Sequence, residues 1–179
     1  MQNWLDTVEI RLMRETDLPS IEWGEEYIRY RKVYRDVYRN FLAGRSILWI
    51  AETEKDGIVG QVFLTQKNPH ELFDPEHPYM LLSSFRVKPA FRNLGLGTLL
   101  LKACEIAAGD RGIQRIFLNC ARSNQRSRAF YERNGYSVFR DDPGRWSYID
   151  HLGQLREEID PAWTMVKVVN QQESEPLEE

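Results

Sequence analysis

The sequence predicts a single α/β (α+β) domain in which a mixed, mostly antiparallel sheet is flanked by helices. Its 179 residues fit one hydrophobic core, because domains typically hold roughly 100 to 200 residues. Hydrophobic residues make up 42% and charged residues 28%, a balance that excludes a collagen, a disordered chain or a membrane protein. Strand and helix periodicities follow the order β α β β β α β α β β, with hairpins at both ends and helices between the middle strands.

The first half of the chain predicts three strands and one long helix. Residues 8–13 alternate apolar and polar side chains, which is the period of a half-buried strand. In residues 25–42 the apolar side chains recur at three- and four-residue steps, which predicts an amphipathic helix that ends near Gly44. Residues 47–53 and 58–66 are rich in aliphatic and aromatic residues and are joined by an Asp-Gly turn, so they predict an antiparallel hairpin.

The second half predicts a loop followed by alternating strands and helices. Residues 67–78 contain three prolines and show no periodicity, which indicates a long loop between two sheet elements. The elements expected after it are a strand at 79–88, a helix that starts after a glycine-bearing turn and stops by residues 109–112, a strand at 115–120, a short helix at 125–133, and strands at 136–140 and 162–169 separated by a polar stretch at 141–161.

Charge and targeting signals favour a cytoplasmic protein. Lysine and arginine total 24 against 27 aspartates and glutamates, a net charge of −3, so no overall positive field attracts nucleic acid or anionic lipid. No window approaches the roughly 18 to 20 apolar residues that span a bilayer, and the N-terminus lacks a signal-peptide pattern. Cys104 and Cys120 make no disulfide framework at this chain length. We expect the folded domain to cover residues 1–169 and residues 170–179 to form a disordered acidic tail.

The segment at residues 92–97 is the strongest candidate for binding chemistry. It lies between a predicted strand and a predicted helix, where the N–H groups of a tight loop and of the first helical turn have no partners. Gly95 and Gly97 remove the Cβ atoms that would keep a phosphate away from the main chain, and Arg92 adds a charge-assisted donor. These features predict a site for two adjacent phosphates.

Other glycine-loop interpretations fit this segment less well. A mononucleotide P-loop requires a different spacing and a lysine that is missing here. A dinucleotide fingerprint starting at Gly95 would need glycine where the chain has Leu100. A plain strand-to-helix turn, with glycines present for packing, remains the simplest alternative.

Two motifs in the chain resemble those of the GNAT family, the Gcn5-related N-acetyltransferases. The family's acetyl-CoA loop reads Arg/Gln-x-x-Gly-x-Gly/Ala after Val-x-Pro, and here residues 87–89 read Val-Lys-Pro and precede the loop at residues 92–97 at the family's spacing. The second motif, Asn-x-x-Ala-x-x-Phe-Tyr-Glu-x-x-Gly-Phe, is similar to residues 124–136, with Ser127 in place of alanine and Tyr136 in place of phenylalanine.

The resemblance implies an acyl-CoA N-acyltransferase fold and an acyltransferase of the EC 2.3.1 class. Two central strands, ending here at Val87 and Cys120, would splay apart to admit the pantetheine arm of acetyl-CoA, the cosubstrate, and no metal is implied. A main-chain N–H group near residues 85–87 would polarise the thioester carbonyl. The residues expected to bind the cofactor are Phe85, Arg86, Val87, Arg92, Asn93, Leu94, Gly95, Leu96, Gly97, Thr98, Asn124, Ser127 and Tyr131.

The resemblance also implies a direct transfer of acetyl to the primary amine of a small molecule or peptide, in a ternary complex. Tyr131 is the candidate general acid for the departing thiolate, because a phenol with a pKa of about 10 stays protonated at neutral pH. The competing interpretation makes Tyr131 a core tyrosine. The strand before the loop lacks the glutamate that many family members carry. The general base stays open among Glu22, Glu25, Glu26, Asp74, Glu76 and His77.

Several alternatives accompany this interpretation. A non-catalytic acyl-CoA sensor on the same fold is consistent with the missing glutamate. A nucleic-acid-binding module would use the tyrosines and arginines of residues 27–39. These residues are better explained as a stripe of packed tyrosines with solvated arginines behind it. The acidic and histidine side chains of residues 70–77 lack metal-ligand spacing. Cys120 is expected to be a buried thiol rather than a nucleophile. The acceptor has no recognisable pattern beyond aromatic residues such as Trp23 and Tyr27, and a homodimer is compatible with the sequence.

Overall fold

The computed structural model describes residues 3–68 and 76–169 of the chain. Its strands are β1 (Val8–Leu12), β2 (Ser46–Thr53), β3 (Gly57–Lys67), β4 (Tyr79–Val87), β5 (Arg115–Ala121), β6 (Ser137–Asp142), β7 (Arg145–Ile149), β8 (Leu155–Ile159) and β9 (Ala162–Val168). Its helices are α1 (Arg31–Leu42), α2 (Leu96–Asp110) and α3 (Gln125–Arg133), with the 3₁₀ turns η1 (Trp4–Thr7), η2 (Glu15–Asp17), η3 (Ser20–Glu22), η4 (Ile28–Tyr30) and η5 (Pro89–Phe91).

Seven of the strands form one mixed sheet, which confirms the predicted fold class. The strand order is β1-β2-β3-β4-β5-β9-β6, and β7 and β8 form a separate two-stranded hairpin. Every neighbouring pair in the large sheet is antiparallel except β4 and β5, which are parallel and connected through α2. The sheet is therefore mostly antiparallel, with a single parallel junction near its centre.

The junction between β4 and β5 is short, and the two strands separate beyond it. Their pairing covers Met80 with Ile116, Leu81 with Phe117, and Leu82 with Leu118, and it then stops. The register between β3 and β4 also shifts after this point, where Ser84 has a positive φ of 48°. Residues 83–87 and 119–121 therefore face an opening in the sheet, which is the splay that the resemblance implied.

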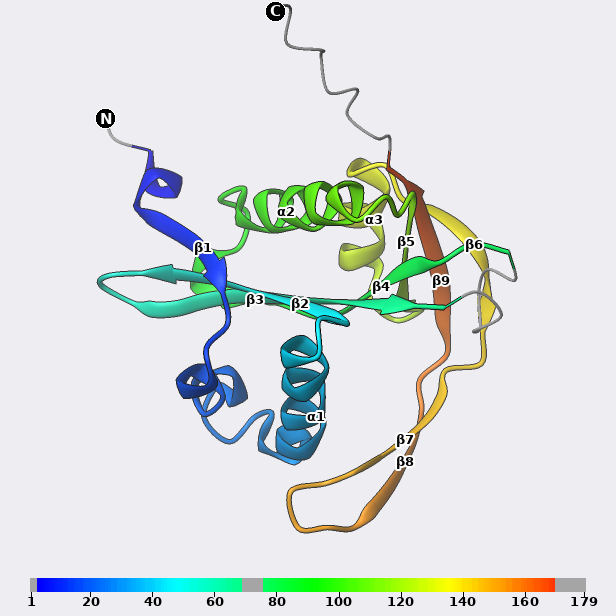
Figure 1. The fold of residues 1–179 in the computed structure, drawn as a ribbon, viewed down its shortest axis with the longest axis horizontal. Helices are drawn as coiled ribbons and strands as arrows, with labels where there is room; N and C mark the ends of the chain where they lie inside the picture. Colours follow the sequence, from blue (N-terminus) through cyan, green and yellow to red (C-terminus); the bar gives the residue numbers. More distant parts are fainter. Residues whose placement is uncertain (1–2, 69–75, 170–179) are drawn as a thin grey trace, which may run out of the picture.

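Helices cover both faces of the sheet (Figure 1). On one face α2 and α3 pack over a cluster that includes Leu100, Leu118 and Tyr131. On the other face α1 and the 3₁₀ turns before it pack over a second cluster that includes Tyr34 and Phe63. Since residues of β3 contribute to both clusters, the sheet is buried on both sides near its centre.

The first long helix is shorter than its periodicity predicted. A helix was expected over residues 25–42, but α1 begins at Arg31 and is preceded by the tighter turn η4. Tyr27 lies under the guanidinium group of Arg86, and the ring of Tyr30 lies 5.0 Å from that of Tyr148. These tertiary contacts, rather than helical periodicity, set the conformation of this segment.

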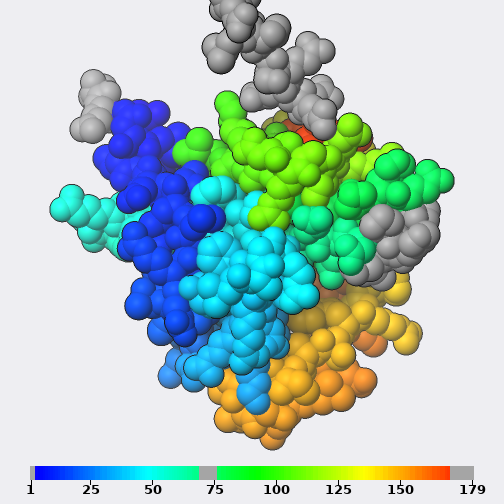
Figure 2. All heavy atoms as spheres, in the orientation of Figure 1, coloured from blue at the N-terminus to red at the C-terminus, as the bar shows by residue number. Residues whose placement is uncertain are grey.

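The polar stretch at residues 141–161, expected to carry no element, holds the end of β6 and the hairpin of β7 and β8. The hairpin lies against α1 and η4, and Figure 2 shows its surface (orange) next to that of α1 (light blue). Most of its side chains are exposed. Only Trp146 and Tyr148 alternate with polar residues and pack against Tyr30, so the apolar alternation is too short to predict a strand.

Some expectations fall outside the described residues. The tail at residues 170–179 and most of the loop at residues 67–78 belong to this group, and with them His70, Glu71 and Asp74. Among the helices of residues 3–68 and 76–169, none has the length and apolar character needed to cross a membrane.

Candidate functional site

A cavity of about 720 Å³ opens where β4 and β5 separate. It brings together side chains and main-chain groups from the end of β4, the turn before α2, and one face of α3. No aspartate, glutamate or histidine is among the described residues that line it. The lining residues are Trp23, Tyr27, Phe85, Arg86, Val87, Arg92, Asn93, Gly95, Gly97, Thr98, Asn124, Arg126, Ser127, Phe130, Tyr131, Arg133 and Asn134.

Eleven of the thirteen residues expected to bind the cofactor line this cavity, and Leu94 and Leu96 do not. The side chain of Leu94 is 46% exposed outside it, whereas Leu96 is buried in the core at the start of α2. Both leucines therefore offer only main-chain groups to a ligand. The side chain of Leu94 is exposed to solvent, and that of Leu96 packs in the core.

The turn before α2 presents a row of free amides. Asn93 and Gly95 adopt left-handed φ angles of 63° and 89°, which fold the chain tightly before the helix begins. Within the described structure, no hydrogen-bond acceptor is found for the N–H groups of residues 93–98. Arg92 donates from Nε to the carbonyl oxygen of Val87 at 2.8 Å, which holds its guanidinium group beside the turn. Such a turn fits the two phosphates of a diphosphate.

Helix α3 faces this turn across the cavity. Asn124 caps the helix, and its Oδ1 accepts a hydrogen bond from the N–H group of Ser127 at 3.0 Å. Residues 124, 127, 131 and 134 follow the three- and four-residue steps of one helix face, and all four line the cavity. Arg126 donates to Oδ1 of Asn93 at 3.0 Å, which ties α3 to the turn.

Tyr131, in the second motif, lies in an aromatic environment. Its ring centroid is 5.4 Å from that of Phe130, 5.8 Å from that of Tyr136 and 6.2 Å from that of Phe85. The residue is only 8% exposed, yet it lines the cavity. Burial raises the pKa of Tyr131 well above the ordinary value of a phenol, so the hydroxyl stays protonated at neutral pH.

Cys120 is close to this site but does not line the cavity. It is 3% exposed, and its Sγ donates to the carbonyl oxygens of Ala121 and Asn124, both at 3.8 Å. Burial raises the pKa of the Cys120 thiol, which disfavours the nucleophilic thiolate. The structure thus supports the expectation of a buried thiol.

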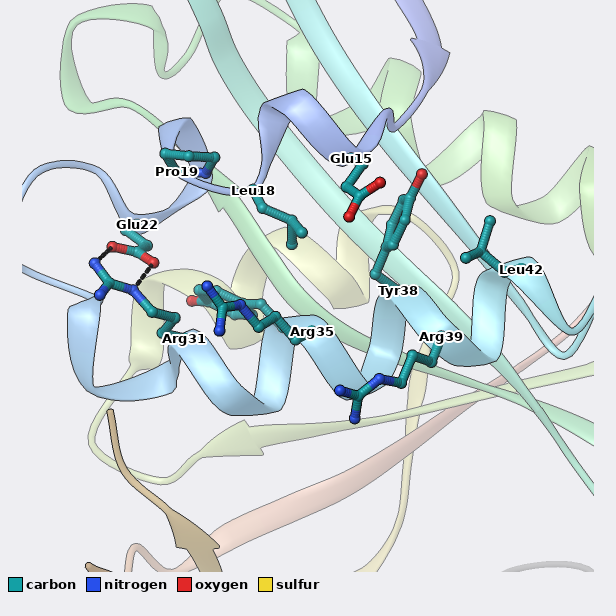
Figure 3. Close-up of a pocket in the computed structure, with 10 residues that line it drawn as sticks. Glu15, Leu18, Pro19, Glu22, Arg31, Arg35, Tyr38, Arg39 and Leu42 are labelled. Carbon is teal, nitrogen blue, oxygen red and sulfur yellow. Dashed lines mark hydrogen bonds and ion pairs between the residues drawn. The ribbon is translucent and has the colours of Figure 1, made fainter. Parts of the chain in front are cut away.

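Of the acidic groups considered as the general base, Glu22 is already paired. Arg31 donates to its two carboxylate oxygens at 2.6 and 2.8 Å, and Glu22 is 7% exposed. The pair borders a second hollow of about 440 Å³ between α1 and residues 15–22, shown in Figure 3. That hollow contains none of the cofactor residues expected from the sequence. Glu25, Glu26, Glu76 and His77 do not line the main cavity.

The sequence-based prediction missed part of the cavity wall. Arg126, Phe130, Arg133 and Asn134 belong to α3 and its C-terminal cap. Three-residue steps from Ser127 and Tyr131 could have located Phe130 and Asn134, but helical spacing from the predicted residues Asn124, Ser127 and Tyr131 does not reach Arg126 or Arg133. Trp23 and Tyr27 come from a segment more than fifty residues before β4, and only their aromatic character drew attention to them.

No three His, Cys, Asp or Glu side chains group at metal-binding distance in the part of the chain that the structure describes.

The splayed strands and the amide-lined turn define the class of the protein, an acyl-CoA N-acyltransferase. The family model described as "Acetyltransferase (GNAT) family" matches residues 10–136, which is more than half of the chain. The chain belongs to this family, and it is accordingly an acyltransferase. The comparison with curated protein sequences gives no match.

Solved structures share the fold at low sequence identity. Naa20 of Chaetomium thermophilum, in complex with a bisubstrate analogue, is 22% identical with a TM-score of 0.68, over 91% of this chain and 87% of its own. The ribosomal-protein-S18-alanine N-acetyltransferase of Escherichia coli is 19% identical with a TM-score of 0.64, over 96% and 99%. Arabidopsis thaliana Naa50, in complex with the bisubstrate analogue CoA-Ac-MVNAL, is 16% identical with a TM-score of 0.66, over 90% and 98%.

Proposed function

We propose that this enzyme transfers acetyl from acetyl-CoA directly to the primary amine of a small molecule or peptide, within a ternary complex. The observation that carries the proposal is the row of unpartnered N–H groups at residues 93–98, placed at the mouth of the gap between β4 and β5. The bisubstrate analogues bound to Naa20 and Naa50, one of them CoA-Ac-MVNAL, support an acceptor amine that meets the cofactor directly.

The cofactor is held along the gap. The diphosphate binds the amides of residues 93–98, and Arg92 adds its remaining N–H groups. The pantetheine arm lies between the splayed strands and pairs with main-chain groups of residues 85–87 as an added strand would. Asn124 uses Oδ1 for the helix cap, so its Nδ2 is the group that donates to the pantetheine, beside Ser127.

The acetyl group is transferred in one addition and one elimination. The neutral amine attacks the thioester carbonyl carbon, and the oxyanion that forms accepts a hydrogen bond from a main-chain N–H group near residues 85–87. The carbon–sulfur bond then breaks, and the phenol of Tyr131 supplies a proton to the departing thiolate. The proton that the amine nitrogen loses goes to water or to an outer base, because no described acid or histidine lines the cavity, and a proton from water restores the phenol of Tyr131.

The same lack of an acid or histidine in the described cavity wall supports a second candidate, a non-catalytic acyl-CoA sensor. One experiment separates the two functions. Coenzyme A binding is measured by calorimetry, and free thiol is then followed with acetyl-CoA and a panel of amines, amino acids, peptides, polyamines and aminoglycosides. Binding with thiol release for at least one amine supports the transferase, whereas binding without release for any amine supports the sensor. Absence of any binding heat would contradict both.

A further inference from the structure

The main cavity is bordered by residues from both faces of the sheet, with Phe130 packed on the cluster under α2 and α3 and Tyr27 packed on the cluster under α1. Phe85 and Val87 pack with the cluster under α2 and α3, which is the cofactor side. The side chain of Arg86, between them in the chain, instead contacts Tyr27 and Tyr34, which belong to the cluster under α1. An acceptor amine that reaches the thioester from the α1 side therefore passes Arg86.

Arg86 is held rigidly at this end of the cavity. Its guanidinium carbon lies 3.8 Å from the ring centroid of Tyr27, and its Nη1 donates a hydrogen bond to the hydroxyl of Tyr34. Lys88, two residues further along, carries a second positive charge, and its Nζ lies 6.0 Å from the ring centroid of Trp23. Trp23 lines the cavity and Lys88 does not, so Lys88 adds its charge from just outside the cavity wall, whereas Arg86 belongs to the wall.

Among the described residues, neither Arg86 nor Lys88 is ion-paired with a carboxylate. Glu22 is occupied by Arg31, and the described cavity wall contains no acid. Opposite Arg86 in the sheet, the fully buried Gln61 has an Nε2 donor without a partner among the described residues. Among the described residues, this side of the cavity therefore offers the positive charge of Arg86 without an ion-paired carboxylate, since Glu26 interacts with Tyr27 and forms no ion pair with Arg86.

We propose that the acceptor amine carries a carboxylate and that Arg86 binds this carboxylate, with Lys88 adding charge. The inference rests on the proposed transferase function and names its substrate class. A guanidinium group whose plane is fixed by a ring presents paired N–H groups, which match the two oxygens of a carboxylate. The same positive charge lowers the pKa of a nearby ammonium group, so it also favours the neutral amine that attacks. The carboxylate belongs to a free amino acid or to an acidic N-terminal residue of a peptide.

The test compares matched acceptors on the wild-type enzyme by release of free thiol from acetyl-CoA. One arm pairs free L-amino acids with their α-carboxamides, a second pairs tripeptides that begin with Asp or Glu with those that begin with Asn or Gln, and a third contains polyamines. We expect kcat/KM to be about ten- to a hundredfold higher for the carboxylate member in one of the first two arms. The arm that shows the preference identifies the source of the carboxylate.

Arg86→Met then tests whether Arg86 causes the preference for the carboxylate member, since methionine keeps an apolar stem and removes the charge. If Arg86→Met does not fold, Arg86→Gln is used in its place. We expect the preference to fall to within about threefold of parity. Arg39→Met, which removes an exposed charge on α1, is the control and should retain the preference. Equal rates for the paired acceptors, preference for polyamines, an unchanged preference in Arg86→Met, or a loss confined to coenzyme A affinity would overturn the inference. Absence of thiol release with every amine would overturn the proposed transferase function as well.

Discussion

Gly97 and Phe130 lie in direct contact where α2 meets α3. A Cβ atom at residue 97 would stand 3.0 Å from Cζ of Phe130, closer than carbon atoms normally approach. Glycine at this position thus lets the first turn of α2, with its free amides, lie against the helix that carries Asn124 and Tyr131. The two motifs of the sequence meet at this contact.

Gly97→Ala is expected to weaken coenzyme A binding by about tenfold, because the ring of Phe130 must move and α3 shifts from the turn. Gly97→Leu should abolish binding. Calorimetry with coenzyme A measures both effects. Gly109→Ala is the matched control in the same helix, since no heavy atom lies within 4 Å of its added Cβ. It should raise the free energy of unfolding by about 0.5 to 1 kcal/mol and leave affinity unchanged. Normal affinity in Gly97→Leu would contradict this assignment of the turn.

Tyr131→Phe is expected to reduce kcat by about a hundredfold or more while coenzyme A affinity stays within about twofold, because only the proton donor is lost. Steady-state thiol release and calorimetry give the two numbers. If the variant turned over as fast as the wild type, Tyr131 would be a packing residue only.

Tyr136→Phe provides the control for Tyr131, because the two rings lie 5.8 Å apart and differ in their access to the cavity. The hydroxyl of Tyr136 is buried without a hydrogen-bond partner among the described residues. Its removal should leave kcat unchanged and raise the free energy of unfolding by about 1 kcal/mol. A large loss of activity in this variant would show that hydroxyl removal acts through packing.

Asp17→Asn should destabilise the fold by about 2 kcal/mol at neutral pH. Although burial raises the pKa of Asp17, hydrogen bonds from Arg11 and from the N–H group of Arg14 outweigh it and hold the pKa below its ordinary value. The stabilisation is therefore complete above the ordinary pKa and is lost as the pH falls through the lower, folded-state pKa. Urea unfolding between pH 7 and pH 3 should show the two proteins converging in acid.

Asp36→Asn is the surface counterpart of that experiment. Asp36 pairs with Arg39 on α1, but both side chains are mostly exposed. The substitution should change the free energy of unfolding by less than about 0.5 kcal/mol. A loss of free energy of unfolding as large as that for Asp17→Asn would contradict the explanation that burial strengthens the Asp17–Arg11 pair.

Cys120→Ala should keep most of the wild-type kcat, because the buried, protonated thiol takes no part in a direct transfer. Intact-mass measurement after incubation with acetyl-CoA alone should show no added acetyl group. An acetylated peptide containing Cys120, together with loss of activity in the alanine variant, would indicate a covalent intermediate instead.

Local patterns predicted most of the sheet, but they failed where tertiary contacts decide the conformation. Strands β2, β3, β4, β5 and β9 and helix α2 have strong apolar patterns because they contribute many buried side chains to the core. By contrast, β6 is mostly exposed, and α3 buries only Tyr131 among its described residues. The β7–β8 hairpin packs against Tyr30 through Trp146 and Tyr148, and Tyr148 is the only largely buried side chain among the described residues of the two strands. Similarly, the segment at residues 23–30 takes its shape from Arg86 and the hairpin, which lie far from it in the sequence.

The site shows the same division. The turn at residues 92–97, proposed to bind the diphosphate, could be predicted because all of its residues are consecutive in the sequence. The α1 side of the site is assembled from Trp23, Tyr27 and Arg86, and no sequence spacing relates them. The sequence alone could not indicate a role for Arg86 in binding the acceptor. Its position in a described cavity wall that contains no acid is known only from the three-dimensional structure.

The three residue pairs between β4 and β5 also govern how the molecule can open. In the described sheet, these pairs are the only strand pairing that joins one half (β1 to β4) to the other half (β5, β9 and β6). Parallel pairing is also slightly less stable per residue than antiparallel pairing. Local opening of one half of the sheet against the other thus breaks few hydrogen bonds. A molecule bound across the seam resists that motion, so hydrogen exchange should slow in both halves at once, even at amides that never touch it.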